Sequence, residues 1–225
     1  MYYHILTSVI GAHSNIQDAI KYFEDNDRII AVVADGLGSR TMSADGAKLI
    51  CRLIVRELKT ISLPLKSEEI SSPKKWYYNL RKKHCKHDDY CTTCSFVVID
   101  KSLKLIGIGQ IGDSPVFIGI DDNPVIPFVQ QKEFSNITDC LGGKTIRSFK
   151  IHNFKYTSHF NVLVSSDGFG DELDHSSMSS LFSYLTAKYK GYSPKSRSRQ
   201  FTKETKATIG NVNSDDKSAI YIWSE

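Results

Sequence analysis

The stretch CSFVVIDKSLKLIGIGQIGDSPVFIGI, residues 94–120, decides the fold. It holds three short runs rich in β-branched and apolar residues. Turn-forming residues separate the runs, namely Asp-Lys-Ser at 100–102 and Gly-Asp-Ser-Pro at 112–115. Neither linker is long enough for the crossover helix that parallel strands require. The stretch therefore predicts an antiparallel meander, which continues through Asp-Asp-Asn-Pro at 121–124 into a fourth strand, PVIPFVQ.

Amphipathic helices and further strands surround this meander. Apolar residues spaced by three and four predict a helix within 43–58, with the stripe Ala47, Ile50, Cys51, Ile54, Val55 and Leu58. Similar patterns predict helices within 71–84 and 174–189. Apolar or β-rich runs predict strands within 2–12, 27–39, 145–154, 160–168 and 217–223. This order of strands and helices indicates an α+β fold of antiparallel sheets covered by helices.

The composition is that of an ordinary globular protein. The 225 residues are 40% apolar and 24% charged, with a net charge of +4, which is enough for one domain spanning 1–225. No apolar run approaches the roughly 18 residues of a membrane span, and residues 1–14 do not resemble a signal peptide. Five cysteines without small-scaffold spacing favour reduced thiols and a cytoplasmic location. Residues 190–206 contain few apolar side chains and are expected to form a mobile surface segment.

Acidic residues recur where apolar runs begin or end. Asp35 and Asp167 follow predicted strands and precede glycines, and Asp113 lies between two strands. Asp18 and Asp215 occupy similar positions. Each alone is most simply a turn residue. Gathered at one end of a sheet, however, five carboxylates would repel one another unless a hard divalent cation bound them. Ligands that are all oxygen atoms favour Mg²⁺ or Mn²⁺ over zinc.

Six segments, taken in order, resemble the metal-dependent serine/threonine protein phosphatases of the type 2C family in their short bacterial form. They are GAHSNIQDA, VVADGLGS, CTTCSFVVID, IGIGQIGDS, VLVSSDGFGDEL and SDDKSAIYI, and they span nearly the whole chain. The resemblance implies a four-layer α-β-β-α sandwich of two antiparallel sheets flanked by helices. It also implies two Mg²⁺ or Mn²⁺ ions at one end of the sheets, with room for a third ion at a weaker site.

The family's mechanism, in which a metal-bridging water attacks phosphorus without a phosphoenzyme, implies roles for individual residues. Asp35 would bridge both metal ions, and the carbonyl of Gly36 would join it. Asp167 and Asp215 would ligate one ion. Asp18 would hold metal-bound waters or touch the second ion. Catalysis would thus depend on the four aspartates at 18, 35, 167 and 215.

Three further positions complete the comparison with the family. Asp113 would help form a weaker third metal site with Asp167. His13 stands where larger relatives place a phosphate-binding Arg, and it would donate a weaker hydrogen bond to phosphate. Leu37 stands where relatives often carry a His that is a candidate general acid. These departures bear on rate and substrate range more than on the metal site.

Three other segments carry residues typical of a site. The segment HCKHDDYCTTC, residues 84–94, has the cysteines and histidines of a zinc site, but its last residues read as a strand in which positions three apart face opposite sides. Basic residues cluster within 74–86 and 188–206. Solvated faces are the simplest interpretation of both clusters, and binding of phosphoproteins or, less favoured, nucleic acid is the alternative.

The sequence therefore predicts a cytoplasmic Mg²⁺- or Mn²⁺-dependent phosphatase acting on phosphoserine or phosphothreonine in proteins. Its partners would be phosphorylated substrates of a serine/threonine kinase, with no membrane involved and nucleic acid less favoured as a partner. The alternative hypothesis is a catalytically weak or dead relative that binds a phosphoprotein as a regulator. The missing Arg and His motivate this alternative, and the complete set of aspartates argues against it.

Overall fold

The central strands face two different hydrophobic cores. In the computed structural model, which describes residues 1–12, 14–129, 139–143 and 145–225, Ile30, Val32 and Ala34 of β3 pack into one core, while Ile29 and Val33 pack into another. Because side chains alternate along a strand, a continuous apolar run fills both faces of a sheet. This is why the runs that predicted buried strands show no polar alternation.

Ten strands form two antiparallel five-stranded sheets, in the orders β1-β10-β9-β6-β7 and β2-β3-β4-β5-β8. The strands are β1 Tyr2–Val9, β2 Ala19–Glu24, β3 Arg28–Ala34, β4 Cys94–Asp100, β5 Leu105–Ile111, β6 Val116–Ile120, β7 Ile126–Phe128, β8 Lys150–Lys155, β9 Phe160–Ser165 and β10 Lys217–Ser224. The predicted meander is antiparallel throughout, but it is split. β4 and β5 pair in one sheet, whereas β6 and β7 pair in the other.

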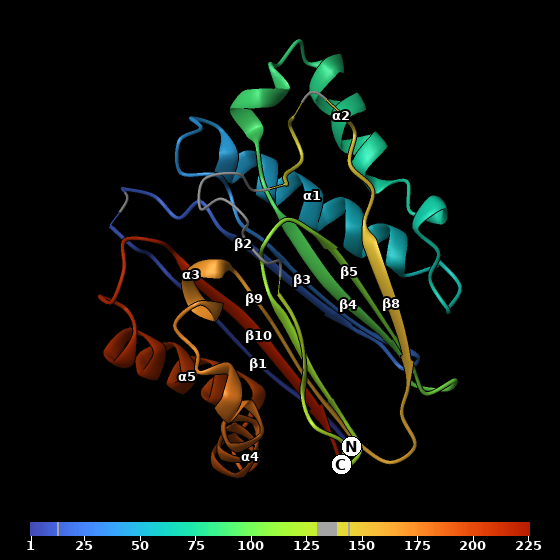
Figure 1. Cartoon of the computed structure of the whole chain (residues 1–225), viewed down its shortest axis with the longest axis vertical. Coiled ribbons are helices and arrows are strands. Elements are labelled where there is room, and N and C mark those ends of the chain that lie inside the picture. The colour runs from blue at the N-terminus through green and yellow to red at the C-terminus, as the bar shows by residue number, and fades with distance from the viewer. Residues whose placement is uncertain (13, 130–138, 144) are drawn as a thin grey trace.

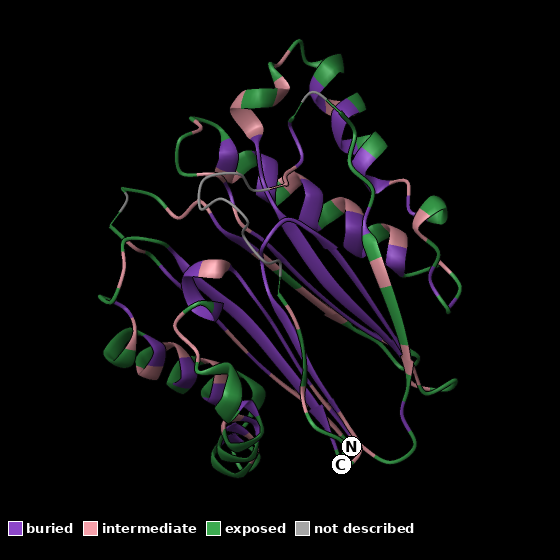
Figure 2. Cartoon of the chain, viewed as in Figure 1, coloured by how far each residue is buried: buried purple, intermediate pink, exposed green. Residues whose placement is uncertain are grey.

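Helices cover the outer faces of both sheets (Figure 1). The helices are α1 Ser43–Leu58, α2 Ser72–Lys82, α3 Asp167–Gly170, α4 Met178–Tyr189 and α5 Pro194–Thr208, with short 3-10 turns η1 Ser67–Glu69, η2 His87–Tyr90 and η3 His175–Ser177. α1 and α2 cover the sheet β2-β3-β4-β5-β8, and α4 and α5 cover the sheet β1-β10-β9-β6-β7. Figure 2 shows the buried layer between the sheets and beneath the helices. The predicted four-layer sandwich is confirmed.

The helix α5 overturns the expectation of a mobile surface segment at 190–206. Ser193 caps its first turn by accepting a hydrogen bond from the Ser196 amide, and Pro194 follows the cap. Arg197, Phe201 and Thr205, spaced by four, are buried. A narrow stripe of three residues is enough to hold an otherwise polar helix against β1, so the scarcity of apolar side chains in this segment was misleading.

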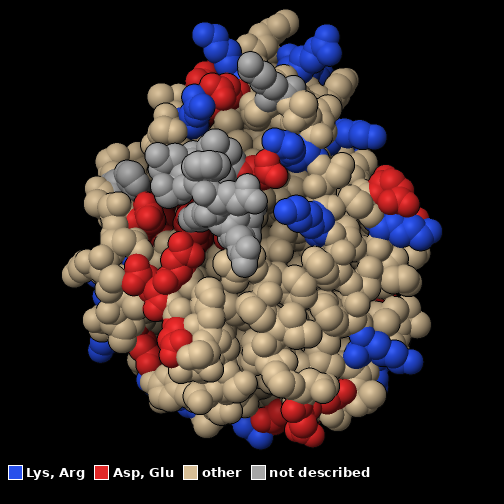
Figure 3. All heavy atoms as spheres, viewed as in Figure 1, with Lys and Arg blue, Asp and Glu red and all other residues tan. Residues whose placement is uncertain are grey.

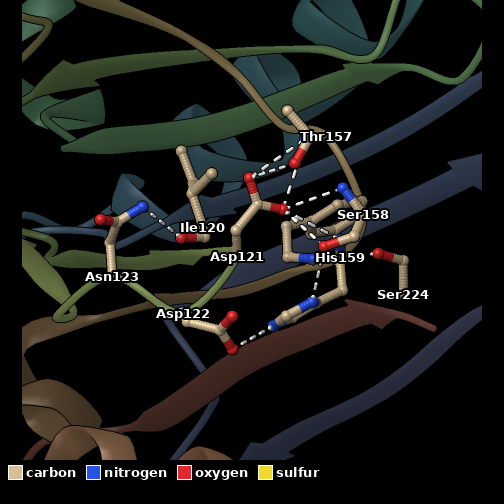
Figure 4. A network of polar contacts seen from close by, with 9 residues as sticks. Ile120, Asp121, Asp122, Asn123, Thr157, Ser158, His159 and Ser224 are labelled. Carbon is tan, nitrogen blue, oxygen red and sulfur yellow. Dashed lines mark hydrogen bonds and ion pairs between the residues drawn. The ribbon is translucent and has the colours of Figure 1, made fainter.

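At the end of the sheets farthest from α3, the two turns after β6 and β8 are joined by one carboxylate. Asp121 accepts hydrogen bonds from the backbone amides of Thr157, Ser158 and His159 and from two of their hydroxyls (Figure 4). These bonds lower the pKa of Asp121 far below its usual range. A cavity of about 740 Å³ lies beside this network. Asp121 therefore has a structural role. Both chain termini lie at this same end of the sheets (Figure 1).

No helix in the described part of the chain has the length and apolar character needed to cross a membrane.

Candidate active site

Six aspartates from five separate segments line one cavity of about 170 Å³. They are Asp18, Asp35, Asp113, Asp167, Asp215 and Asp216. Each lies just outside a strand, and β2 pairs with β3 so that Ala19 faces Ala34, which places Asp18 beside Asp35. Gly36 lines the same cavity. On the face drawn in Figure 3, acidic side chains gather over the region of α3, whereas Lys and Arg are scattered over α1 and α2.

The structure thus brings together all the predicted aspartates, from residue 18 to residue 215. His13, the predicted phosphate-binding residue, lies outside the described residues. Leu37 lines the cavity, as expected from its place directly after Gly36.

Two threonines fix the backbone of Asp35. Thr92 Oγ1 donates a hydrogen bond to the carbonyl oxygen of Asp35 at 2.8 Å, and the amide of Asp35 donates to Thr93 Oγ1 at 3.2 Å. Thr93 Oγ1 also lies 2.6 Å from Ser114 Oγ, next to Asp113. The threonine pair therefore links the ends of β3, β4 and β5 around the cavity.

Glycine is required after Asp35 because the chain is crowded there. A Cβ on Gly36 would lie 2.7 Å from the carbonyl oxygen of Gln17 and 2.8 Å from the carbonyl carbon of Ser43. Both are backbone atoms, which cannot move aside cheaply. The segment before β2, the end of β3 and the start of α1 thus approach one another closely only because residue 36 has no side chain.

Burial and the charges of neighbouring acids disfavour the ionised forms of Asp18 and Asp35. Removal from water raises the pKa of Asp18 to about 7; the hydroxyl of Ser218 opposes this rise, and the charge of Asp216 adds to it. Removal from water, with the charges of Asp18 and Asp167, raises the pKa of Asp35 well above its usual range. Asp18 is 5% exposed, and its Oδ2 has no hydrogen-bond partner in the structure described. A bound cation would remove these penalties.

Asp216 is a structural acid that the sequence analysis missed. Its Oδ1 accepts a hydrogen bond from the Gly11 amide at 2.8 Å, and its Oδ2 accepts one from the Gln17 amide at 2.6 Å. It therefore ties the segment leading into β2 to the start of β10. Nothing in the sequence distinguished which of the adjacent acids Asp215 and Asp216 would accept hydrogen bonds from backbone amides and which would face the cavity alone.

The buried Lys217 holds the loop that carries Asp215. Its side chain is fully buried, and Nζ donates hydrogen bonds to Asn213 O at 2.9 Å, Asn213 Oδ1 at 2.6 Å and Asp215 O at 2.6 Å. Asn213 Nδ2 in turn donates to Glu172 Oε1 at 2.5 Å, beyond α3. This network couples the loop of Asp215 to the segment that follows Asp167.

Across the residues that the structure describes, no three His, Cys, Asp or Glu side chains are already grouped so as to hold a metal ion. For residues 84–94 this gives the zinc interpretation no support. For the aspartate cavity, the donor set still fits a hard divalent cation, because all its ligands are oxygen atoms, the acids repel one another and Asp18 Oδ2 is unsatisfied.

Sequence comparison identifies the family. The sequence model described as Protein phosphatase 2C matches residues 7–203. The chain belongs to the protein phosphatase 2C family. The predicted resemblance is thus confirmed, although no curated protein sequence matches the chain.

Solved structures of this family share the fold. A bacterial serine phosphatase superimposes with a TM-score of 0.72 at 15% identity, covering 100% of this chain and 98% of the other. PstP of Mycobacterium tuberculosis gives a TM-score of 0.68 at 13% identity, covering 98% and 97%. RsbX in complex with magnesium gives 0.65 at 14% identity, covering 99% and 94%. Another structure of PstP's catalytic domain holds two manganese ions.

Proposed function

We propose that the protein is a Mg²⁺- or Mn²⁺-dependent phosphatase that hydrolyses phosphoserine and phosphothreonine in proteins. The observation that carries the proposal is the convergence of six aspartates on one cavity in a chain of the phosphatase 2C family. Bound divalent cations would supply the Lewis acidity that polarises the phosphoryl group and activates a water for attack.

The cavity residues would divide the work of holding the cations. Asp35 would contact two ions, with the carbonyl oxygen of Gly36 beside it, because the threonine pair fixes this backbone. Asp167 and Asp215 would bind one ion from the side of β9 and β10. Asp18, 5% exposed and adjacent to Asp35, would orient water or contact the second ion. Asp113 would contribute to a weaker third site.

Electrostatics make the proposed activity strictly dependent on metal. Among the described residues that line the cavity, every charged side chain is acidic. A phosphate dianion would therefore be repelled from the metal-free cavity, and the cations must reverse the sign of the potential before substrate binds. His13 is the proposed side chain that donates a hydrogen bond to the substrate phosphate, and Leu37 cannot protonate a leaving group.

Phosphorylated proteins, made by a serine/threonine kinase, are the proposed partners. Members of this fold whose structures are known include PppA, described as a regulatory component of a secretion system, and a protein of the bacterial stressosome. The proposed location is the cytoplasm, where the five free cysteines would stay reduced.

The test is hydrolysis of para-nitrophenyl phosphate and of a phosphothreonine peptide, with Mn²⁺ and with a chelator. We expect turnover with Mn²⁺ only, and a loss of at least 100-fold in Asp35→Asn. Asp122→Asn, an exposed carboxylate at the far end of the sheets, is the matched control and should match the wild type. Equal turnover by wild type and Asp35→Asn would refute the proposal.

A second candidate function, a phosphoprotein-binding regulator without catalysis, is favoured by one observation: Leu37, which cannot donate a proton, lines the cavity where related phosphatases often carry a His. Calorimetry separates the two functions. A regulator should bind the phosphopeptide equally well after chelation, whereas the phosphatase should lose binding.

A further inference from the structure

Two cysteines distant in sequence meet beside the cavity. Thr92 and Leu141 form a two-hydrogen-bond antiparallel bridge, with N···O distances of 3.1 and 2.9 Å. The residues that precede them, Cys91 and Cys140, are diagonal neighbours on one face of this bridge, close enough for each thiol to shift the pKa of the other. The thiol of Cys91 donates a hydrogen bond to Asp88 Oδ1 at 3.8 Å. All five cysteines are free thiols in the structure.

A glycine opposite Cys91 makes room for this contact. Gly142 adopts φ +105°, and a Cβ there would lie 2.6 Å from the Sγ of Cys91. The Gly142 amide donates to Tyr77 Oη at 2.9 Å, so α2 holds the same segment from the other side. The sulfur of Cys91 thus lies against the segment 140–142 that carries Cys140, and this segment is held by the hydrogen bond to Tyr77.

The two thiols differ in solvent exposure and in the direction of their pKa shifts, as the two cysteines of a redox pair do. Cys91 is 2% exposed, and the neighbouring Cys140 thiol, burial and the charge of Asp88 together raise its pKa. Cys140 is half-buried, and the neighbouring Cys91 thiol, with the guanidinium groups of Arg40 and Arg147, lowers its pKa despite partial burial and the charge of Asp139. A partly exposed thiol with a lowered pKa beside a buried partner thiol is the arrangement of a reactive cysteine with a resolving cysteine.

We propose that Cys91 and Cys140 form a peroxide-sensitive dithiol that closes reversibly to a disulfide. The thiolate of Cys140 attacks one oxygen of hydrogen peroxide, the O–O bond breaks, and the leaving hydroxide takes a proton to become water. The sulfenic acid on Cys140 is then attacked by the sulfur of Cys91, which loses its proton as the second water leaves. Two thiols and one peroxide thus give one disulfide and two waters, and an added dithiol reverses the reaction.

The disulfide would act on the candidate active site through the backbone. The carbonyl oxygen of Cys91 accepts a hydrogen bond from the amide of Leu37 at 3.0 Å, and the next residue, Thr92, bonds to the carbonyl of Asp35. A covalent bond at Cys91 therefore pulls on the segment that fixes Asp35, and we expect it to lower Mn²⁺-dependent turnover. This consequence rests on the proposed function, so the thiol chemistry is measured separately, without metal or substrate.

Peptide mapping of the full chain tests the dithiol directly. After brief treatment with hydrogen peroxide and alkylation, tryptic peptides 87–101 and 133–144 should be joined and should separate with dithiothreitol. Peptide 87–101 also contains Cys94, so variants assign the bond. Cys91→Ser should abolish the link and leave a dimedone-reactive sulfenic acid on Cys140, whereas Cys94→Ala should retain the link.

The remaining cysteines provide internal controls. Cys51 and Cys94 are 2% and 0% exposed, and burial raises both pKa values, so they should resist the same treatment. Cys85 is partly exposed, and its sulfur accepts a hydrogen bond from the hydroxyl of Tyr90. Persistent sulfenic acid on Cys140 in the wild type, or linkage of Cys140 to Cys85 as often as to Cys91, would overturn the dithiol. A mapped Cys91–Cys140 disulfide with unchanged turnover would overturn only the coupling to the site.

Discussion

Replacing Asp18 with asparagine tests whether the cavity stores electrostatic strain when no metal is bound. The pKa of Asp18 is about 7 in the folded protein, against 3.8 for the free side chain. Below about pH 4 both states carry the proton, so the contribution of this group to stability is fully present. As the pH rises through 7 the buried carboxyl must ionise, and that contribution is lost.

The magnitude follows from the size of the shift. Each pKa unit corresponds to about 1.4 kcal/mol, so a rise of roughly three units costs the metal-free protein up to about 4 kcal/mol above pH 7. Asparagine resembles the protonated acid and stays neutral at every pH. We therefore expect Asp18→Asn to be about 2–4 kcal/mol more stable than the wild type at pH 8, and only about 1–2 kcal/mol more stable at pH 5.

Urea unfolding in a chelator, followed by the fluorescence of Trp76 and Trp223, measures these differences between pH 5 and pH 8. Both tryptophans are fully buried and will report loss of the cores beneath α2 and α5. Mn²⁺ should raise the stability of the wild type more than that of the variant, since the ion binds only the folded protein. A variant with the same pH dependence as the wild type, or one less stable at pH 8, would refute the reasoning.

Three further substitutions test other parts of the account. Gly36→Ala should weaken Mn²⁺ binding at least tenfold in calorimetry, because the added Cβ would clash with backbone atoms. Gly191→Ala, with open space around it, should leave the affinity unchanged. Equal affinities of the two variants would contradict the crowding argument. Lys217→Met should lower the free energy of unfolding, measured with urea, by about 2–4 kcal/mol, because the loop of Asp215 loses three hydrogen bonds. A decrease below about 0.5 kcal/mol would show that the loop keeps its conformation without Lys217. Phe201→Ala should destabilise the protein by about 3–4 kcal/mol, whereas the exposed control Lys203→Ala should cost less than about 0.5 kcal/mol. Similarly small values for both variants would mean that α5 does not pack against the sheet.

Local patterns predicted most of the fold. The stripe from Ala47 to Leu58 is buried in α1 as expected, and the strands with two buried faces are continuous apolar runs. β2 was missed because it is a short, partly exposed edge strand with little periodic signal. α5 was missed because only three of its fifteen residues are buried, which leaves the segment largely polar in sequence. Pattern analysis detects burial of whole faces better than burial of narrow stripes.

Some features of the candidate site were likewise predictable from the sequence, and others were not. Aspartates at strand ends are visible in the sequence, since strands deliver their last residues to the edges of a sheet. Their convergence on one cavity was expected from the family resemblance, and the structure places all five together. The supporting contacts of Asp216 and Lys217 were not foreseeable, because they depend on which backbone amides and carbonyls the loops present. The meeting of Cys91 with Cys140 likewise depends on a bridge between segments about 50 residues apart.

The central claim is that these aspartates bind divalent cations. X-ray diffraction from crystals soaked in Mn²⁺, recorded near the manganese absorption edge, tests it most directly. We expect anomalous density in contact with the carboxylate of Asp35 and bordered by Asp167 and Asp215. An empty cavity in well-soaked crystals, with manganese found only elsewhere on the protein, would contradict the claim.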